Sequence, residues 1–183
     1  AQVALVRLAP AAEPGLLAAV GALCGDESAP GEQRLAAALS LLAACAREPA
    51  GRPRGDGIDC VALALKALPA AMALDDPDEV RPLLLKLGQS GDARVGPALL
   101  PQLAVVRARP DVVTALGQLG RPEATPELAE LLAEDPYVPV RAAAATALGR
   151  IGGAAARAAL VRAQAREREA PVLTAIVQAL ASP

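Results

Sequence analysis

Charged side chains that could bind a partner gather in two segments of the C-terminal third of the chain. The first segment spaces four glutamates as one stripe of a helix would: Glu123, Glu127, Glu130 and Glu134. The next expected helix carries four arginines: Arg157, Arg162, Arg166 and Arg168. If the two helices lie side by side, an acidic stripe adjoins a basic one. This pattern indicates a charged groove for a partner. The simpler interpretation is a solvated face with ion pairs of at most ~1 kcal/mol each.

The three cysteines do not have the spacing of a metal or redox motif. Cys24, Cys45 and Cys60 lie far apart, without a Cys-x-x-Cys pair. Their simplest interpretation is as small buried side chains in helices. A disulfide, if one forms, should join Cys45 to Cys60, because the end of one expected helix and the start of the next lie at the same end of an antiparallel pair. Such a bond would indicate export; otherwise a cytoplasmic location is favoured.

Composition excludes several classes of function. The chain of 183 residues contains no histidine, which excludes Ser-His-Asp and Cys-His catalysis and histidine-bound metals or haem. We therefore expect no enzyme and no cofactor or metal. The balance of 18 basic and 20 acidic residues argues against nucleic acid, and no apolar run is long enough for membrane insertion. The expected partner is another protein.

An internal repeat is the strongest structural signal. Residues 114–120 (Thr-Ala-Leu-Gly-Gln-Leu-Gly) recur at 146–152 as Thr-Ala-Leu-Gly-Arg-Ile-Gly, 32 positions later, and more degenerately at 174–180. Leu87-Gly88 keeps the same frame upstream. A period near 30 without the alternation of a strand predicts an all-α fold, an α-solenoid of stacked antiparallel helical hairpins. Asp76-Pro77 and Asp135-Pro136 predict helix starts. The two glycines of the repeated Leu-Gly-x-x-Gly frame predict helix ends.

These signals define the elements that must position the charged stripes. We expect residues 1–183 to form a single repeat domain, with degenerate repeats over 1–75 and regular repeats over 76–183. The regular repeats place second helices at 92–107, 122–133 and 153–166, followed by a terminal helix at 170–181. Pro101 predicts a break near Leu99. The degenerate part places helices near 2–9, 13–23, 32–47 and 57–68, with breaks at 25–31 and 48–57.

One segment of the degenerate part, Leu35 to Ala46, is apolar almost all round, with Ser40 as its polar interruption. A helix of this kind is normally buried between layers. The alternative is an exposed apolar patch that docks another chain.

Residues 135–141 (Asp-Pro-Tyr-Val-Pro-Val-Arg) through 147–152 (Ala-Leu-Gly-Arg-Ile-Gly) resemble the HEAT-like repeat of phycobilin lyase subunits. Residues 76–91 match more weakly, and residues 108–120 keep the Leu-Gly end but lack the arginine after Val112. The resemblance implies that second helices line a concave face. The repeats and the lack of catalytic chemistry predict a non-catalytic scaffold that binds another protein through this face. The resemblance implies the alternative, an accessory subunit of a bilin lyase-like complex. For the latter, only Tyr137 could stack on a tetrapyrrole.

Overall fold

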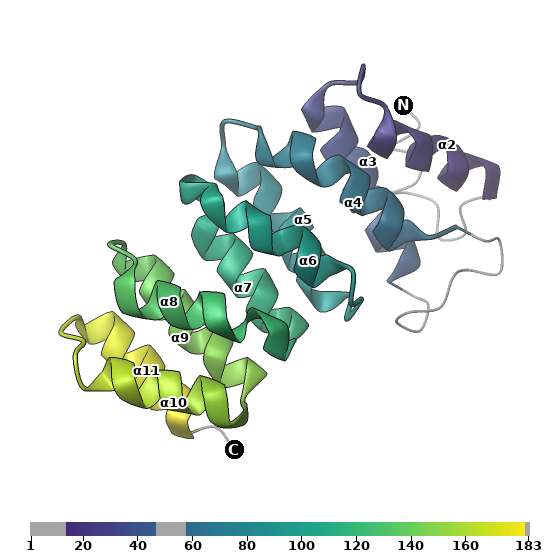
Figure 1. Cartoon of the computed structure of the whole chain (residues 1–183). Helices are drawn as coiled ribbons and strands as arrows, with labels where there is room; N and C mark the ends of the chain where they lie inside the picture. Colours follow the sequence, from purple (N-terminus) through teal and green to yellow (C-terminus); the bar gives the residue numbers. More distant parts are fainter. Residues whose placement is uncertain (1–13, 47–57, 182–183) are drawn as a thin grey trace. The chain divides into compact units, whose positions relative to one another are not determined.

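A computed structural model describes residues 14–46 and 58–181 (Figure 1). The expected helix at 2–9 and the expected break at 48–57 lie outside the described residues. Over the described ranges the chain forms helices and turns without a strand, and helices pack on their neighbours in the sequence. The all-α repeat fold is therefore confirmed. The chain divides into two compact units, residues 1–95 and 96–183.

The described residues of the first unit form the helices α2 (Pro14–Gly25), α3 (Gly31–Cys45), α4 (Cys60–Met72) and α5 (Pro77–Gln89). Helix α3 packs against the other three. This position buries most of the apolar segment from Leu35 to Ala46, including Leu41 and Leu42. The prediction that this segment is buried between helices is confirmed, so it does not provide a large exposed patch.

The second unit contains two layers of helices, preceded at the boundary by α6 (Val95–Leu99). The first layer is formed by α7 (Arg109–Leu119), α9 (Val138–Ile151) and α11 (Ala170–Ala181). The second layer contains α8 (Thr125–Glu134) and α10 (Gly153–Gln164), which pack on each other and on α9. The bounds of α11 confirm the terminal helix expected at 170–181.

Prolines lie close to the ends of two helices, α4 and α6. The break expected near Leu99 within the helix expected at 92–107 is confirmed: α6 ends at Leu99, and two 3-10 turns (Leu100–Ala104 and Val106–Ala108) follow it. Proline lacks the N–H that would continue the α-helical hydrogen bonds. The helix predicted at 57–68 ends too early, because α4 continues through Pro69 to Met72. Burial of Met72 stabilises this last turn, while Pro69 is exposed.

Glycines end the helices where the repeat predicted. Helix α7 ends before Gly120, which has φ 68° and ψ 22°. Helix α9 ends before Gly152, at φ 69° and ψ −163°, and Gly153 also has a positive φ of 80°. Residues with a Cβ rarely adopt these conformations. Two such glycines in succession allow the chain to reverse sharply into α10.

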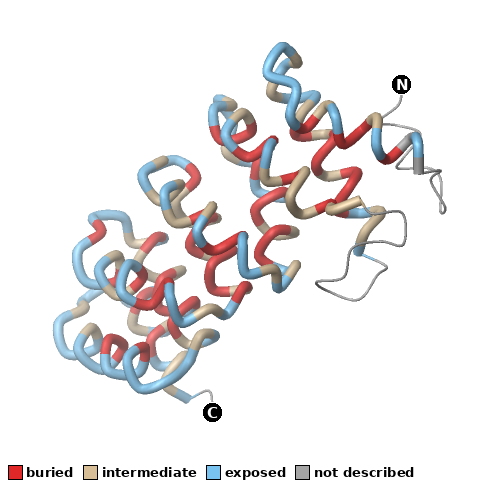
Figure 2. Tube along the Cα trace, turned by 45° about the vertical axis from the view of Figure 1, so that its right-hand side comes forward, coloured by how far each residue is buried: buried red, intermediate tan, exposed pale blue. Residues whose placement is uncertain are grey.

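The core of each unit consists of small and branched aliphatic side chains. Buried positions recur on the sides of helices that face their neighbours (Figure 2). The largest fully buried side chains are leucines, among them Leu116, Leu128 and Leu148. Alanine is the commonest of the remaining buried residues, which explains a chain with 54% hydrophobic residues and one aromatic ring.

Candidate functional site

Helices α8 and α10 lie side by side, and a cleft of about 440 Å³ opens between them. It is lined in part by aliphatic residues from both helices: Ala129, Leu132 and Ala133 from α8, and Ala159 and Ala163 from α10. Four alanines leave room that larger side chains would fill. The cleft therefore lies between the two segments whose charges were singled out in the sequence.

The structure brings part of the predicted site into this cleft. Glu134, Arg162 and Arg166 line it. Glu127 and Glu130 are exposed on α8 but do not line the cleft, and neither does Glu123, which precedes α8. Arg157 is exposed on α10 and donates a hydrogen bond of 3.2 Å from Nη1 to the carbonyl oxygen of Leu180. Arg168 follows α10 and is also exposed.

The two stripes do not neutralise each other. Within the described part of the chain, no ion pair joins the α8 glutamates to Arg157, Arg162 or Arg166. Of the simpler interpretation, the ion pairs between helices are not found among these described residues, whereas the solvated face is, because these side chains are exposed. Glutamates of one helix and arginines of the next are thus available to groups outside the unit.

A partly buried ion pair between Arg141 and Glu167 also lines the cleft. Arg141, in the first turn of α9, donates from Nε to Glu167 Oε2 at 2.8 Å and from Nη2 to Oε1 at 3.2 Å. Its Nη1 donates to the carbonyl oxygen of Asp135 at 2.9 Å. These hydrogen bonds from Arg141 lower the pKa of Glu167 to about 2 and raise the pKa of Arg141. Both groups stay charged at neutral pH and hold each other in place.

A second buried ion pair lies beside the first. Asp135, whose side chain is 1% exposed, accepts from Arg109 Nη1 at 2.6 Å and from the backbone N–H of Tyr137 at 2.8 Å. The prediction that Asp135-Pro136 starts the helix directly is wrong. Asp135 instead closes a turn at Tyr137, and α9 begins at Val138. By contrast, Asp76 caps α5 as predicted, accepting from the N–H of Asp78 at 2.8 Å.

The two ion pairs are equivalent positions of the repeat. Arg109 and Arg141 are 32 positions apart, as are Asp135 and Glu167. Sequence reasoning missed this pairing because it expected the repeat's arginine directly after Val112. The frame that aligns the two Thr-Ala-Leu-Gly motifs aligns Arg109 with Arg141 instead. The offset of 32 was the signal that could have found both pairs.

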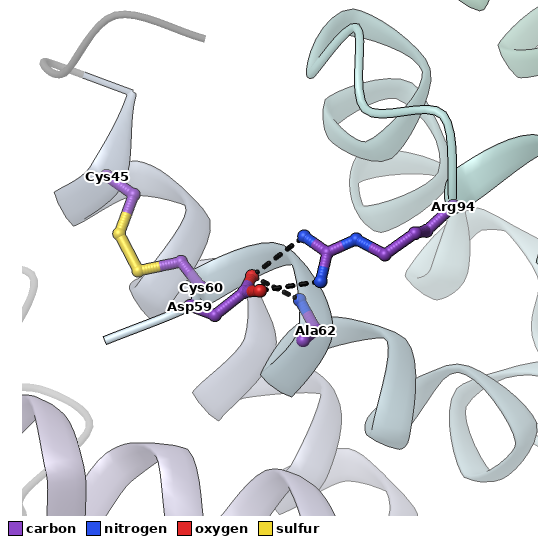
Figure 3. The surroundings of a disulfide bond; sticks show 5 residues. All are labelled: Cys45, Asp59, Cys60, Ala62 and Arg94. Carbon is purple, nitrogen blue, oxygen red and sulfur yellow. Dashed lines mark hydrogen bonds and ion pairs between the residues drawn. A yellow bond between two sulfur atoms is a disulfide. The ribbon is translucent and has the colours of Figure 1, made fainter. Parts of the chain in front are cut away.

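In the first unit, a disulfide joins Cys45 to Cys60, with their Cα atoms 6.4 Å apart (Figure 3). It connects the end of α3 to the start of α4. Cys24 is the free cysteine of the described chain; it is buried, and this burial raises the pKa of its thiol to about 11. A buried thiol of this kind is a poor nucleophile at neutral pH.

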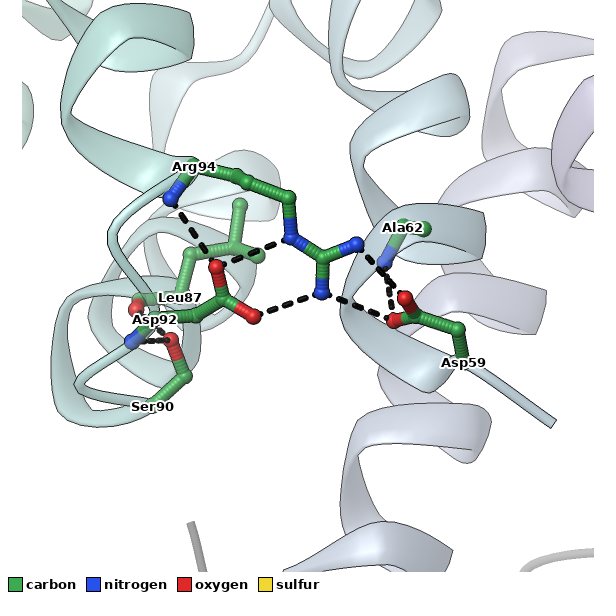
Figure 4. A network of polar contacts seen from close by, with 6 residues as sticks. All are labelled: Asp59, Ala62, Leu87, Ser90, Asp92 and Arg94. Carbon is green, nitrogen blue, oxygen red and sulfur yellow. Dashed lines mark hydrogen bonds and ion pairs between the residues drawn. The ribbon is translucent and has the colours of Figure 1, made fainter. Parts of the chain in front are cut away.

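Next to the disulfide, Asp59 caps α4 by accepting from the N–H of Ala62 at 2.9 Å. Arg94, from the turn after α5, donates from Nη1 and Nη2 to both carboxylate oxygens of Asp59 (Figure 4). Its Nη2 also pairs with Asp92 at 2.6 Å. The hydrogen bonds from Arg94 lower the pKa of Asp59. This network, which sequence reasoning did not find, fixes the start of α4 against the turn after α5.

Two further expectations concern metals and membranes. Over the described ranges 14–46 and 58–181, no group of three His, Cys, Asp or Glu side chains could hold a metal ion. None of the helices that the structure describes is long and apolar enough to cross a bilayer.

The repeat seen in the second unit is similar to a known family of repeats. The family model for HEAT repeats matches residues 97–181, which is nearly the whole second unit. No curated protein matches the chain. The layer of α7, α9 and α11 and the layer of α8 and α10 are therefore the two layers of a HEAT-like repeat array.

Proposed function

We propose that this HEAT-like repeat protein is a non-catalytic scaffold that binds another protein through the face formed by α8 and α10. This charged face comprises the cleft and seven charged residues: Glu123, Glu127, Glu130, Glu134, Arg157, Arg162 and Arg166. One observation carries the proposal. The cleft between α8 and α10 is lined by alanines and by exposed Glu134, Arg162 and Arg166, which form no ion pairs with one another in the described chain.

The chemistry of the charged face suits a protein partner. The alanines that line the cleft let a partner's backbone come close, and charges of both signs set the orientation of the partner. A nucleic acid would meet an acidic stripe along α8, which repels phosphates at the place where affinity for nucleic acid requires cations. The absence of histidine from the sequence further supports binding without catalysis.

The alternative is an accessory subunit of a bilin lyase-like complex, the type that the sequence resemblance suggests. Its support in the structure is Tyr137, the sole aromatic residue of the chain, whose side chain is 54% exposed next to Pro136 at the cleft. A shift in visible absorbance when the protein is mixed with free bilin would support this function. Unchanged bilin spectra would remove it.

Affinity capture with a charge-swapped variant tests the proposed scaffold. Glu127→Lys combined with Arg162→Glu keeps the net charge and exchanges one charge on each side of the face. Arg150→Glu is the control, because Arg150 is exposed on α9 and does not line the cleft. We expect the wild type and the control to capture the same proteins from lysate and the swapped variant to lose them. Capture unaffected by the swap, or turnover of a substrate by the purified protein alone, would overturn the proposal.

A further inference from the structure

We infer that the segment bound in the cleft is an acidic peptide segment, whose carboxylates are held by Arg162 and Arg166. This inference rests on the proposed function and names the chemistry of the partner. It starts from the arrangement of the two arginines. Arg162 lies in the last turn of α10 and Arg166 in the turn that follows it, and both line the cleft.

The donors of these two guanidinium groups are free for a ligand. Neither Arg162 nor Arg166 forms an ion pair or a side-chain hydrogen bond with the described part of the chain. Arg141 also lines the cleft, but Glu167 and the carbonyl oxygen of Asp135 accept from its Nε, Nη1 and Nη2. A ligand anion is therefore directed to Arg162 and Arg166 and not to Arg141.

The charge balance of the cleft points to the same class of ligand. Of its three carboxylates, Asp135 is paired with Arg109 and Glu167 with Arg141. Glu134 is the one that no ion pair in the described chain neutralises, and two such arginines line the cleft with it. The cleft thus has an excess of positive charge on the α10 side. Guanidinium groups bind carboxylates through paired hydrogen bonds, which are stronger than neutral ones.

The shape of the cleft selects a peptide segment over a large flat surface. Its volume of about 440 Å³ admits a few side chains, and the alanines that line it (Ala129, Ala133, Ala159 and Ala163) offer apolar contact. Glu127 and Glu130 on α8 repel further carboxylates. An acidic segment therefore binds with its carboxylates toward α10 and away from α8.

Fluorescence anisotropy with synthetic peptides tests this inference. The probe is a labelled alanine-based peptide with two glutamates four residues apart, and its comparators carry two glutamines or two lysines instead. At low ionic strength we expect the glutamate peptide to bind and the other two to bind at least ~10-fold more weakly, a difference of ~1.4 kcal/mol. Arg162→Gln with Arg166→Gln should weaken binding of the glutamate peptide by the same factor. Arg150→Gln should leave the affinity for this peptide unchanged.

Each other outcome overturns the inference. Equal binding of the glutamate and glutamine peptides, or no binding at all, would exclude carboxylate recognition. Tighter binding of the lysine peptide would assign the face to a basic partner through α8. Sedimentation of the protein alone provides a further control: self-association that is lost in the double arginine variant would make a second copy of the chain the occupant. In all of these cases the scaffold proposal stands if captured proteins still depend on the charged face, so the two failures are distinguishable.

Discussion

A Cβ atom placed on Gly117 would lie 2.6 Å from the Cβ of Ala147, closer than two packed carbons approach. Gly117 lies inside α7 and Ala147 inside α9. The same contact recurs 32 positions later, where a Cβ on Gly149 would lie 2.6 Å from the Cβ of Ala179. A glycine against an alanine thus sets the distance between successive helices of the first layer.

Gly117→Ala should destabilise the second unit by about 1–3 kcal/mol, because the added methyl group must displace α9. The free energy of unfolding in denaturant measures this effect. Gly15→Ala is the matched control: Gly15 lies in α2 with nothing within 4 Å of a Cβ, and alanine favours helix. An unchanged or raised stability of Gly117→Ala would contradict the close approach of α7 and α9.

The repeat predicted much of this arrangement from the sequence, yet not the role of each glycine. The frame Leu-Gly-x-x-Gly indicated helix ends, and Gly120 and Gly152 do end helices. Periodicity could not show that Gly117 serves packing between helices, because that role depends on which residue of a distant helix faces it. In the same way, the spacing of the charged residues predicted adjacent stripes, while the cleft between them depends on alanines whose facing could not be deduced from one helix alone.

The buried pair of Arg109 and Asp135 should contribute strongly to stability. Arg109→Met leaves a carboxylate that is 1% exposed without its cationic partner, and we expect a loss of about 3 kcal/mol in the free energy of unfolding. Arg109→Met combined with Asp135→Asn removes the stranded charge. A double-mutant cycle should therefore show a double variant less destabilised than the sum of the single variants. Additive losses would indicate that the two side chains do not interact.

The pair of Arg141 and Glu167 predicts a dependence of stability on pH. Glu167 has a pKa of about 2 in the folded chain, below its ordinary value of 4.5. Because the folded pKa is the lower one, the contribution of Glu167 is present above pH ~4.5 and is lost as the pH falls toward 2. Melting temperatures of the wild type and of Glu167→Gln should differ at neutral pH and converge near pH 2. A difference that is constant from pH 7 to pH 2 would contradict this pairing.

The disulfide between Cys45 and Cys60 predicts both a thiol count and a stability effect. Alkylation of the unfolded, unreduced protein should modify one cysteine of three, Cys24. A count of one modified cysteine would support export. In the folded protein Cys24 should react slowly because its thiol pKa is about 11. Cys45→Ser with Cys60→Ser should lower the free energy of unfolding by ~3 kcal/mol, as a bond that closes a loop of this size does. Three modified cysteines would show that the bond is absent.

Photo-crosslinking from the cleft tests the scaffold function most directly. A photoreactive amino acid replaces Ala133, which lines the cleft. In a control protein it replaces Thr146, which is exposed on α9 and does not line the cleft. We predict that the probe at position 133 crosslinks a discrete protein partner in lysate, that position 146 does not, and that Arg162→Glu with Arg166→Glu abolishes the product. Equal crosslinking from both positions, or none that depends on these arginines, would contradict binding of a protein at the face of α8 and α10.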